Sequence, residues 1–268
     1  MPDLLYEKRN GIAYITFNRP ERRNAISPQA MVLLAEAWLD FKEDDSLRVA
    51  ILTGAGNEAF CSGADLGRLI PLFSGARPPE DEWDRKLLEN RRLRDIALLR
   101  RFDLYKPVIS AVNGWALAGG TEILLATDIR LAVPHARLGL TEVRWALVPS
   151  GGSLVRLARQ IPYCKAMEIL LTGEPISAEE AYRIGLINRI VPPERLMEEA
   201  EAIARRIAEN GPLAVRKAKE AVLRTSGVPL EDAFRIENEI GREVFASEDA
   251  REGPRAFLEK RKPVYKGR

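Results

Sequence analysis

The sequence predicts an α/β fold in which strand–loop–helix units repeat and the last third of the chain is helical. Strand signals at 49–52, 108–112 and 128–133 alternate with glycine-containing loops and helical segments, and this alternation implies stacked β-β-α layers. After residue 142 the β-branched runs become scarce. New helices are expected to begin at Ser177, Pro193 and Pro212.

The chain is expected to open with a hairpin and a helix. Two short extended runs, Leu4–Arg9 and Ile12–Phe17, flank Asn10-Gly11, a dipeptide that suits the positive φ angles of a tight hairpin turn. Ser27-Pro28 then places a capping hydroxyl before a proline at the first helical position, and apolar residues follow at helical spacing. We expect this helix to end near Asp44.

A long charged amphipathic helix is expected from Glu82 to Asp103. The basic residues between Arg91 and Arg101 are interleaved with leucine, isoleucine and alanine, so they are predicted to form a solvated helix face. A short apolar helix is predicted near Glu122–Ala126.

Residues 1–195 are predicted to form the β-β-α core, and residues 196–268 a helical oligomerisation region. No glycine or serine linker separates the two parts. The second part carries apolar residues that need a partner surface, and these include Ala233, Phe234, Ile236, Ile240, Val244 and Phe245.

The composition is that of an ordinary soluble globular protein, with 46% apolar residues, 30% charged residues and a formal net charge of +2. Such a balance gives no strong field that would draw the protein to nucleic acid or to a membrane. No apolar leader segment opens the chain, and no stretch approaches the ~20 apolar residues that span a bilayer. Cys61 and Cys164 form no disulfide framework. We therefore expect a cytoplasmic protein.

Three features imitate functional sites. Gly54–Ala59 matches the loose G-x-G-x-x-A pattern of dinucleotide-binding folds, but the loop continues through Phe60–Gly63 and does not open into a helix. His135 is the only histidine and is expected in a turn between strands. Cys61 is expected to be a small apolar residue, because no histidine partner is available to activate it.

Three glycine-containing segments carry the functional signal, and they are Ala59–Leu66, Lys106–Gly114 and Ala118–Glu122. They resemble the crotonase (enoyl-CoA hydratase/isomerase) superfamily. The resemblance continues to Glu252–Arg261, so it covers nearly the whole chain. It implies a crotonase-like spiral of repeated β-β-α units with a helical C-terminal region, assembled as a homotrimer or as a homohexamer of two trimers.

An enolate that forms from a thioester carbonyl needs two hydrogen-bond donors aimed at its oxygen. Backbone N–H groups in glycine-rich loops supply such donors without interference from side chains. The resemblance places them at Ala64 and Gly119. Gly119 lies at the start of a predicted helix, where free N–H groups and the helix dipole favour developing negative charge.

The resemblance also matches Glu122 and Glu142 to the two acids of hydratases. One activates water for attack on Cβ, and the other delivers a proton to Cα. Glu122 stands at the edge of the apolar run 123–126, where an unpaired carboxylate is costly to bury. Two neighbouring carboxylates also push their proton affinities apart, which suits acid–base work. The alternative for Glu122 is a partner of the helix dipole.

The implied substrate is an acyl-CoA thioester, with neither metal nor nicotinamide as cofactor. The terminal segment with Phe257 and Lys260 is expected to reach the CoA of a neighbouring subunit. Arg22 and Arg23 have a second interpretation as exposed loop charges. The acyl tail is expected within the region 66–99, narrowed by Trp83 and Trp115. The residues expected to contact CoA are Arg22, Arg23, Ala25, Ser62, Ala64, Asp65, Leu66, Phe257 and Lys260.

We therefore expect a 2-enoyl-CoA hydratase. The alternatives are an isomerase or a carnitinyl-CoA dehydratase-like enzyme of the same superfamily, and a non-catalytic acyl-CoA-binding or RNA-binding protein. The balanced charge argues against nucleic acid. Ala118 stands in a run that often holds three glycines in the family, and Ser150 stands where many hydratases have glycine. These departures leave the choice of substrate open.

Overall fold

The hairpin predicted at the N-terminus opens the larger of two sheets in the structure, a computed structural model that describes residues 1–268. Asn10 and Gly11 adopt φ angles of 52° and 75°, so the tight turn is confirmed. β1 and β2 are antiparallel, and the sheet continues from β2 with parallel strands in the order β1-β2-β3-β5-β7-β10. The bounds are β1 (Leu4–Arg9), β2 (Ile12–Phe17), β3 (Val49–Gly54), β5 (Val108–Val112), β7 (Ile129–Ala132) and β10 (Arg189–Ile190).

A second, smaller sheet has the order β4-β6-β8-β9, parallel except for the β8–β9 pair. From β3, β5 and β7 the chain passes each time into the smaller sheet, and a helical segment follows. This is the repeated β-β-α unit, and it confirms the predicted fold class. The bounds are β4 (Ala59–Cys61), β6 (Trp115–Leu117), β8 (Arg137–Gly139) and β9 (Ile176–Ser177).

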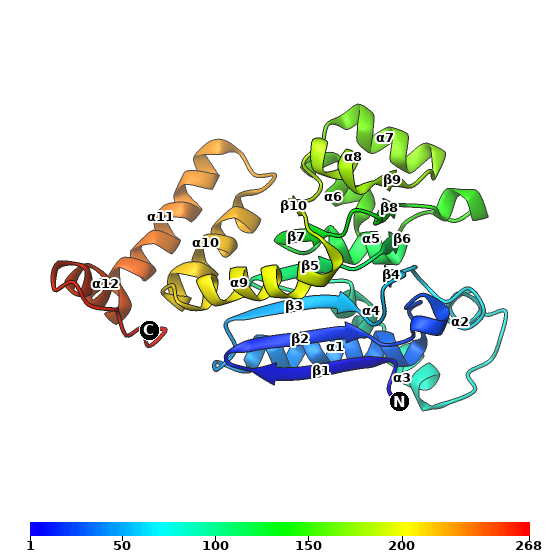
Figure 1. Ribbon diagram of the computed structural model, residues 1–268, viewed down its shortest axis with the longest axis horizontal. Helices are drawn as coiled ribbons and strands as arrows, with labels where there is room; N and C mark the ends of the chain where they lie inside the picture. Colours follow the sequence, from blue (N-terminus) through cyan, green and yellow to red (C-terminus); the bar gives the residue numbers. More distant parts are fainter.

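Helices cover the larger sheet and form the C-terminal part. α1 packs on β1 and β2, while α9 packs on β3, β5 and β7. α10, α11 and α12 extend away from the sheets at one end of the molecule (Figure 1). The bounds are α1 (Pro28–Glu43), α2 (Leu69–Ser74), α3 (Glu82–Glu89), α4 (Arg92–Ala97), α5 (Gly119–Leu124), α6 (Ser153–Gln160), α7 (Tyr163–Thr172), α8 (Ala178–Arg183), α9 (Leu196–Ala208), α10 (Pro212–Thr225), α11 (Leu230–Ala246) and α12 (Glu248–Leu258), with 3-10 turns η1 (Pro20–Arg22), η2 (Glu142–Trp145) and η3 (Pro193–Arg195).

The predicted helix starts are confirmed. The Ser27 hydroxyl accepts a hydrogen bond from the Ala30 N–H at 3.0 Å, and Pro28 is the first helical residue. Ser177 caps α8 in the same way, Pro193 begins η3 and Pro212 begins α10. Each of these residues satisfies or removes an N–H that has no partner within a helix.

The single helix predicted from Glu82 to Asp103 is wrong. The chain forms two short helices, α3 and α4, because Asn90 adopts φ −122° and ψ 84°, outside the helical range. Its side-chain oxygen accepts the Arg92 N–H at 3.1 Å, which starts a new helical segment. Leu99 and Arg101 then take positive φ angles of 49° and 48° and end the helical path.

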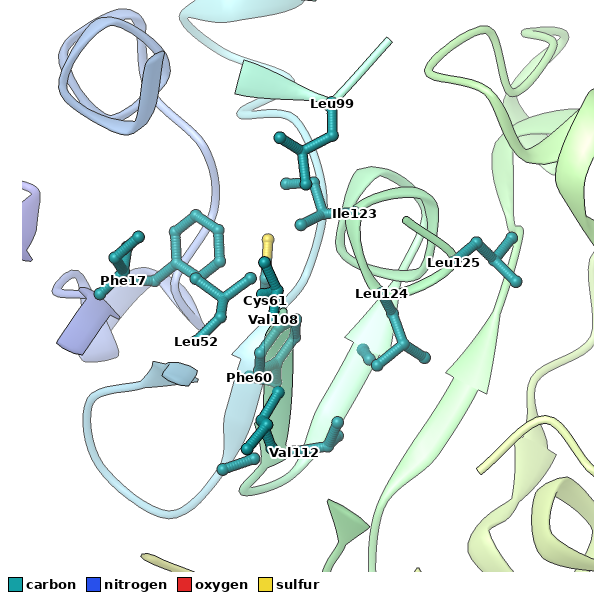
Figure 2. Packing of buried hydrophobic residues seen from close by; sticks show 14 of the residues in the cluster. Phe17, Leu52, Phe60, Cys61, Leu99, Val108, Val112, Ile123, Leu124 and Leu125 are labelled. Carbon is teal, nitrogen blue, oxygen red and sulfur yellow. The ribbon is translucent and has the colours of Figure 1, made fainter. Parts of the chain in front are cut away.

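One apolar core joins both sheets with α1, α5 and α9. Figure 2 shows the Cys61 side chain among Phe17, Leu52 and Ile123, and all four residues have almost no exposed surface. Burial raises the pKa of the Cys61 thiol to about 12. The prediction of a small apolar residue at this position is therefore confirmed. No helix has the length and apolar character needed to cross a bilayer.

The C-terminal helices differ from α9 in their burial. Leu196, Ala200 and Ala204 of α9 belong to the core, whereas Phe234 and Phe245 of α11 are largely exposed. α9 thus packs with the sheet although it follows residue 195. The division into a core and an oligomerisation region stays a prediction.

Candidate active site

A cavity of about 350 Å³ lies between the start of α5, the segment 141–150 and the helices α2 and α4. It is mainly apolar, and it is open enough for a ligand to enter. Six of the residues singled out in the sequence line it together, and they are Ser62, Ala64, Leu66, Gly119, Glu122 and Glu142.

Two hydrogen bonds hold Glu122 in the lining of this cavity. Its Oε1 accepts the Gly151 N–H at 2.6 Å and the Ser153 hydroxyl at 2.7 Å. Only 6% of the residue surface is exposed. Donors that point at one carboxylate oxygen suit the charged form and fix its position. The alternative of a carboxylate that only faces the helix dipole leaves these two contacts unexplained.

Glu142 is the first residue of η2 and lines the same cavity. Its Oε2 is buried and has no hydrogen-bond partner. Burial, together with the smaller effect of the Glu122 charge, raises the pKa of Glu142 to about 7. A carboxyl group that stays protonated near neutral pH can donate a proton. The two glutamates therefore differ within one cavity, because Glu122 accepts two hydrogen bonds and the Glu142 Oε2 accepts none.

The backbone amides of Ala64 and Gly119 are available for a ligand. Neither donates to a backbone carbonyl, and both residues line the cavity. The two sites are close, because a Cβ at Gly119 would lie 3.6 Å from the Ala64 nitrogen. Gly119 is the first residue of α5, so its N–H lacks an intrahelical partner. Two backbone N–H groups this close together can both donate to one oxygen atom of a ligand.

Ala118, which precedes Gly119, adopts φ 48° and ψ −122°. This region strongly favours glycine, so alanine there carries backbone strain. The Ala118 methyl group also limits its neighbour, since a Cβ at Gly63 would come within 2.7 Å of it. The turn that aims the Gly119 amide is thus held by close packing.

The other expected CoA-contacting residues lie outside the lining of this cavity. Arg22 and Arg23 are exposed, and the Arg23 Nε donates to Glu58 at 2.6 Å. Ala25 accepts a hydrogen bond from Arg19 through its carbonyl, and Asp65 pairs with Arg19 at 2.9 Å. Phe257 in α12 and Lys260 after it are exposed. Their roles toward CoA stay predictions.

Trp83 and Trp115, which were expected to narrow the tail pocket, do not line the cavity, whereas Trp145 and Leu147, which were not expected there, do. The region 66–99 was correctly expected to contribute, since Leu66, Leu69, Ile70 and Leu98 all line it. Arg94 was assigned to a solvated helix face. The structure leaves this residue half-exposed and also places it in the cavity lining, where it donates to the Ser150 hydroxyl.

The two remaining imitations of sites behave as expected. The segment after Gly54 leads into the strand β4 and not into a helix. His135 lies exposed in the turn between β7 and β8, where its Nε2 is 3.1 Å from the Asn57 carbonyl oxygen.

Comparison with known proteins identifies the family. The family model for enoyl-CoA hydratase/isomerase matches residues 7–268. The chain is 45% identical to the enoyl-CoA hydratase EchA19 of Mycobacterium tuberculosis, over 100% of this chain and 97% of that one. It is 39% identical to the (E)-benzylidenesuccinyl-CoA hydratase of Thauera aromatica (97% and 98% covered), and 40% identical to the carnitinyl-CoA dehydratase of Salmonella typhi (both fully covered).

Solved structures agree with this result. The crystal structure of the enoyl-CoA hydratase EchA1 from Mycobacterium marinum superposes with a TM-score of 0.88, at 39% identity and with both chains fully covered. The chain therefore belongs to the enoyl-CoA hydratase/isomerase family within the crotonase superfamily, and it is an enzyme of the enoyl-CoA hydratase class.

Proposed function

We propose that the enzyme adds water across the 2,3 double bond of a 2-enoyl-CoA thioester in this cavity. The observation that carries the proposal is the contrast between the two glutamates. Glu122 is fixed by two donors, whereas the Glu142 Oε2 is buried without a partner. A buried polar atom without a partner is costly. Its place in the cavity wall suits a group that hydrogen-bonds to the substrate or to the added water.

The hydrogen bonds of Glu122 and the raised pKa of Glu142 support Glu122 as the base and Glu142 as the acid. The Glu122 carboxylate takes a proton from water while the water oxygen bonds to Cβ. The π electrons move to the thioester oxygen as an enolate, and this oxygen accepts hydrogen bonds from the Ala64 and Gly119 amides. Protonated Glu142 then gives its proton to Cα. The proton gained by Glu122 restores Glu142 through the remaining solvent, so the net reaction consumes one water.

Two further parts of the proposal concern CoA and assembly. Phe257 and Lys260 are exposed and lie outside the cavity of their own chain, which supports contact with CoA bound to a neighbouring copy. The exposed apolar residues of α11 support a homotrimer or homohexamer. A monomer in sedimentation at micromolar concentration would contradict this assembly. An unchanged KM in the Lys260→Ala enzyme would remove Lys260 from the CoA site.

The test of the reaction is direct. Purified enzyme mixed with crotonyl-CoA and longer 2-enoyl-CoAs should remove the absorbance of the conjugated thioester, with formation of the 3-hydroxyacyl-CoA. Migration of the double bond without hydration would instead indicate an isomerase. The second candidate is elimination of water from a specialised hydroxyacyl-CoA, which the full-length similarity to carnitinyl-CoA dehydratase favours. Turnover of that substrate class with no activity on simple enoyl-CoAs would select it.

A further inference from the structure

The cavity contains one positively charged side chain, and it has no carboxylate partner. Among the lining residues Arg94 is the only lysine, arginine or histidine. It forms no ion pair, whereas Arg77 in the neighbouring loop pairs with Asp84 at 2.8 Å. Asp95, the next residue, is 3.5 Å from Arg100. The guanidinium of Arg94 is therefore not neutralised by the protein.

Contacts with two other lining residues hold Arg94 at the cavity wall. One of its terminal nitrogens donates to the Ser150 hydroxyl at 2.9 Å. Its guanidinium carbon lies 5.1 Å from the centre of the Phe73 ring, within the range of a cation–π contact. A guanidinium has five N–H donors, and only this one hydrogen bond is formed. The remaining donors are available to a ligand.

The position of Ser150 fixes which part of a substrate Arg94 could meet. The next residue, Gly151, donates its N–H to Glu122, so Arg94 reaches the wall beside the proposed base. The thioester oxygen would lie at the Ala64 and Gly119 amides, and neither residue contacts Arg94. A group that contacts Arg94 is therefore carried by the acyl part beyond Cβ and not by CoA. The planar guanidinium of an arginine can donate two parallel hydrogen bonds to the two oxygens of a carboxylate.

We propose that the substrate is a 2-enoyl-CoA whose acyl chain ends in a second, free carboxylate, and that Arg94 binds this carboxylate. This inference rests on the proposed function for its chemistry, because it names the substrate class of the same site. Arg94 is half-exposed, and an apolar chain that covers it would remove water from the guanidinium without supplying a counter-charge, which is unfavourable. A carboxylate supplies the counter-charge and uses the free donors.

The experiment compares two substrates of the same shape. Glutaconyl-CoA carries a carboxylate one methylene beyond the double bond, and 5-methyl-2-hexenoyl-CoA carries a neutral isopropyl group at that place. We expect the parent enzyme to prefer glutaconyl-CoA in kcat/KM by ~10–100-fold, the range of charge-assisted hydrogen bonds. The Arg94→Met enzyme should lose this ratio. Arg94→Lys, which keeps the charge without the fork, should retain part of it.

Arg91→Met is the matched control, because Arg91 is exposed and lies outside the lining of the cavity. It should keep the parental ratio. Thermal melting of each variant separates a folding defect from a change in preference. A parental ratio near one, or a ratio unchanged in Arg94→Met, would overturn the inference and leave the hydratase proposal intact.

Binding of unreactive saturated thioesters tests the carboxylate site even if the hydratase proposal fails. Titration calorimetry with glutaryl-CoA and 5-methylhexanoyl-CoA needs no turnover. Tighter binding of glutaryl-CoA by ~10–100-fold, lost in Arg94→Met, would support the carboxylate site even if no enoyl-CoA were hydrated. Equal binding of both esters would overturn it.

Discussion

The two ends of the cavity are built in different ways. At the reaction end, all residues of α5 are buried, and the backbone passes so close to its neighbours that a Cβ at Gly120 would lie 2.1 Å from the Cys61 carbonyl oxygen. At the acyl end, α2, α3 and α4 are short, and ion pairs such as Arg68 with Asp81 and Arg77 with Asp84 connect the segment between α2 and α3. The backbone at the reaction end is fixed by contacts between buried atoms. The acyl end is formed by side chains that can be substituted without moving that backbone.

This difference separates chemistry from substrate choice. Substitutions at the reaction end should change rate constants, because small displacements of catalytic groups are costly. Substitutions at the acyl end should change which acyl group is accepted, because they alter cavity volume or charge while Glu122 and the two amides stay in place.

The largest effect is expected from Glu122→Gln. The substitution keeps size but removes the base, so hydration of crotonyl-CoA should fall by ~10²–10⁴. In Glu142→Gln the hydration rate should fall by a factor in the same range, because this substitution removes the acid. Stopped-flow absorbance measures the rate, and calorimetry with a saturated acyl-CoA should show a much smaller change in affinity. Glu43→Gln, an exposed carboxyl at the end of α1, is the control. Parental rates in Glu122→Gln would disprove the two-glutamate mechanism.

Gly151→Ala should displace the base without removing it. A Cβ at this position would lie 2.4 Å from the Glu122 Oε2, so the carboxylate has to move. We expect a ~10–100-fold loss of kcat with little change in KM. Gly241→Ala in α11 is the matched control, since a Cβ there meets nothing within 4 Å. If Gly151→Ala retained full activity, the tight packing of the reaction end would have no catalytic consequence.

The pH dependence should follow the shared proton of the glutamate pair. Burial and then the charge of Glu122 raise the pKa of Glu142 to about 7, so the active form with one proton is lost above that pH. We expect kcat/KM for hydration to fall ~10-fold per unit above pH 7. Addition of water takes up no net proton, so kcat/KM for the reverse dehydration should fall in parallel. A rate that rises through pH 7 would show that both carboxylates act ionised.

The sequence predicted the reaction end better than the acyl end, and the reason is physical. At the reaction end, residues that are close in the sequence are also close in the site. A strand, a glycine-rich loop and a helix start follow one another there, and the Gly119 amide and Glu122 lie within four residues. The hairpin and the helix caps were predicted for the same reason, because each depends on one or two adjacent residues. The partners of Glu122 could not be predicted, since Gly151 and Ser153 meet it only through the tertiary fold.

At the acyl end, helical periodicity gave the wrong answer. It predicted one helix with its arginines in solvent, but the Asn90 side chain divides the segment. That break redirects α4, and Arg94 then faces Ser150 across more than 50 residues of sequence. Periodicity describes the faces of a helix that exists. It does not tell where a break will turn one residue of the polar face toward a cavity.

A smaller effect is expected from Ile70→Ala at the acyl end. Ile70 is half-buried and lines the cavity, so the change widens the space for the tail. The ratio of kcat/KM for 2-decenoyl-CoA to that for crotonyl-CoA should rise by roughly 3–10-fold, below the range for fully enclosed pockets. Leu88→Ala, an exposed residue of α3 outside the lining, should keep the parental ratio. A fall in kcat for both substrates by the same large factor would break the proposed separation of the two ends.

The smallest effect concerns stability, at the turn that aims the Gly119 amide. Ala118 adopts φ 48° and ψ −122°, and glycine adopts such angles without the steric cost of a Cβ. Ala118→Gly should therefore raise the free energy of unfolding by about 1 kcal/mol, since relief of strain outweighs the greater freedom of glycine in the unfolded chain. Ala136→Gly, at a buried alanine with ordinary φ, should lower it. Denaturant titration measures both changes. A destabilised Ala118→Gly enzyme would mean that contact of the methyl group with Gly63 holds the turn more strongly than its backbone strain opposes it.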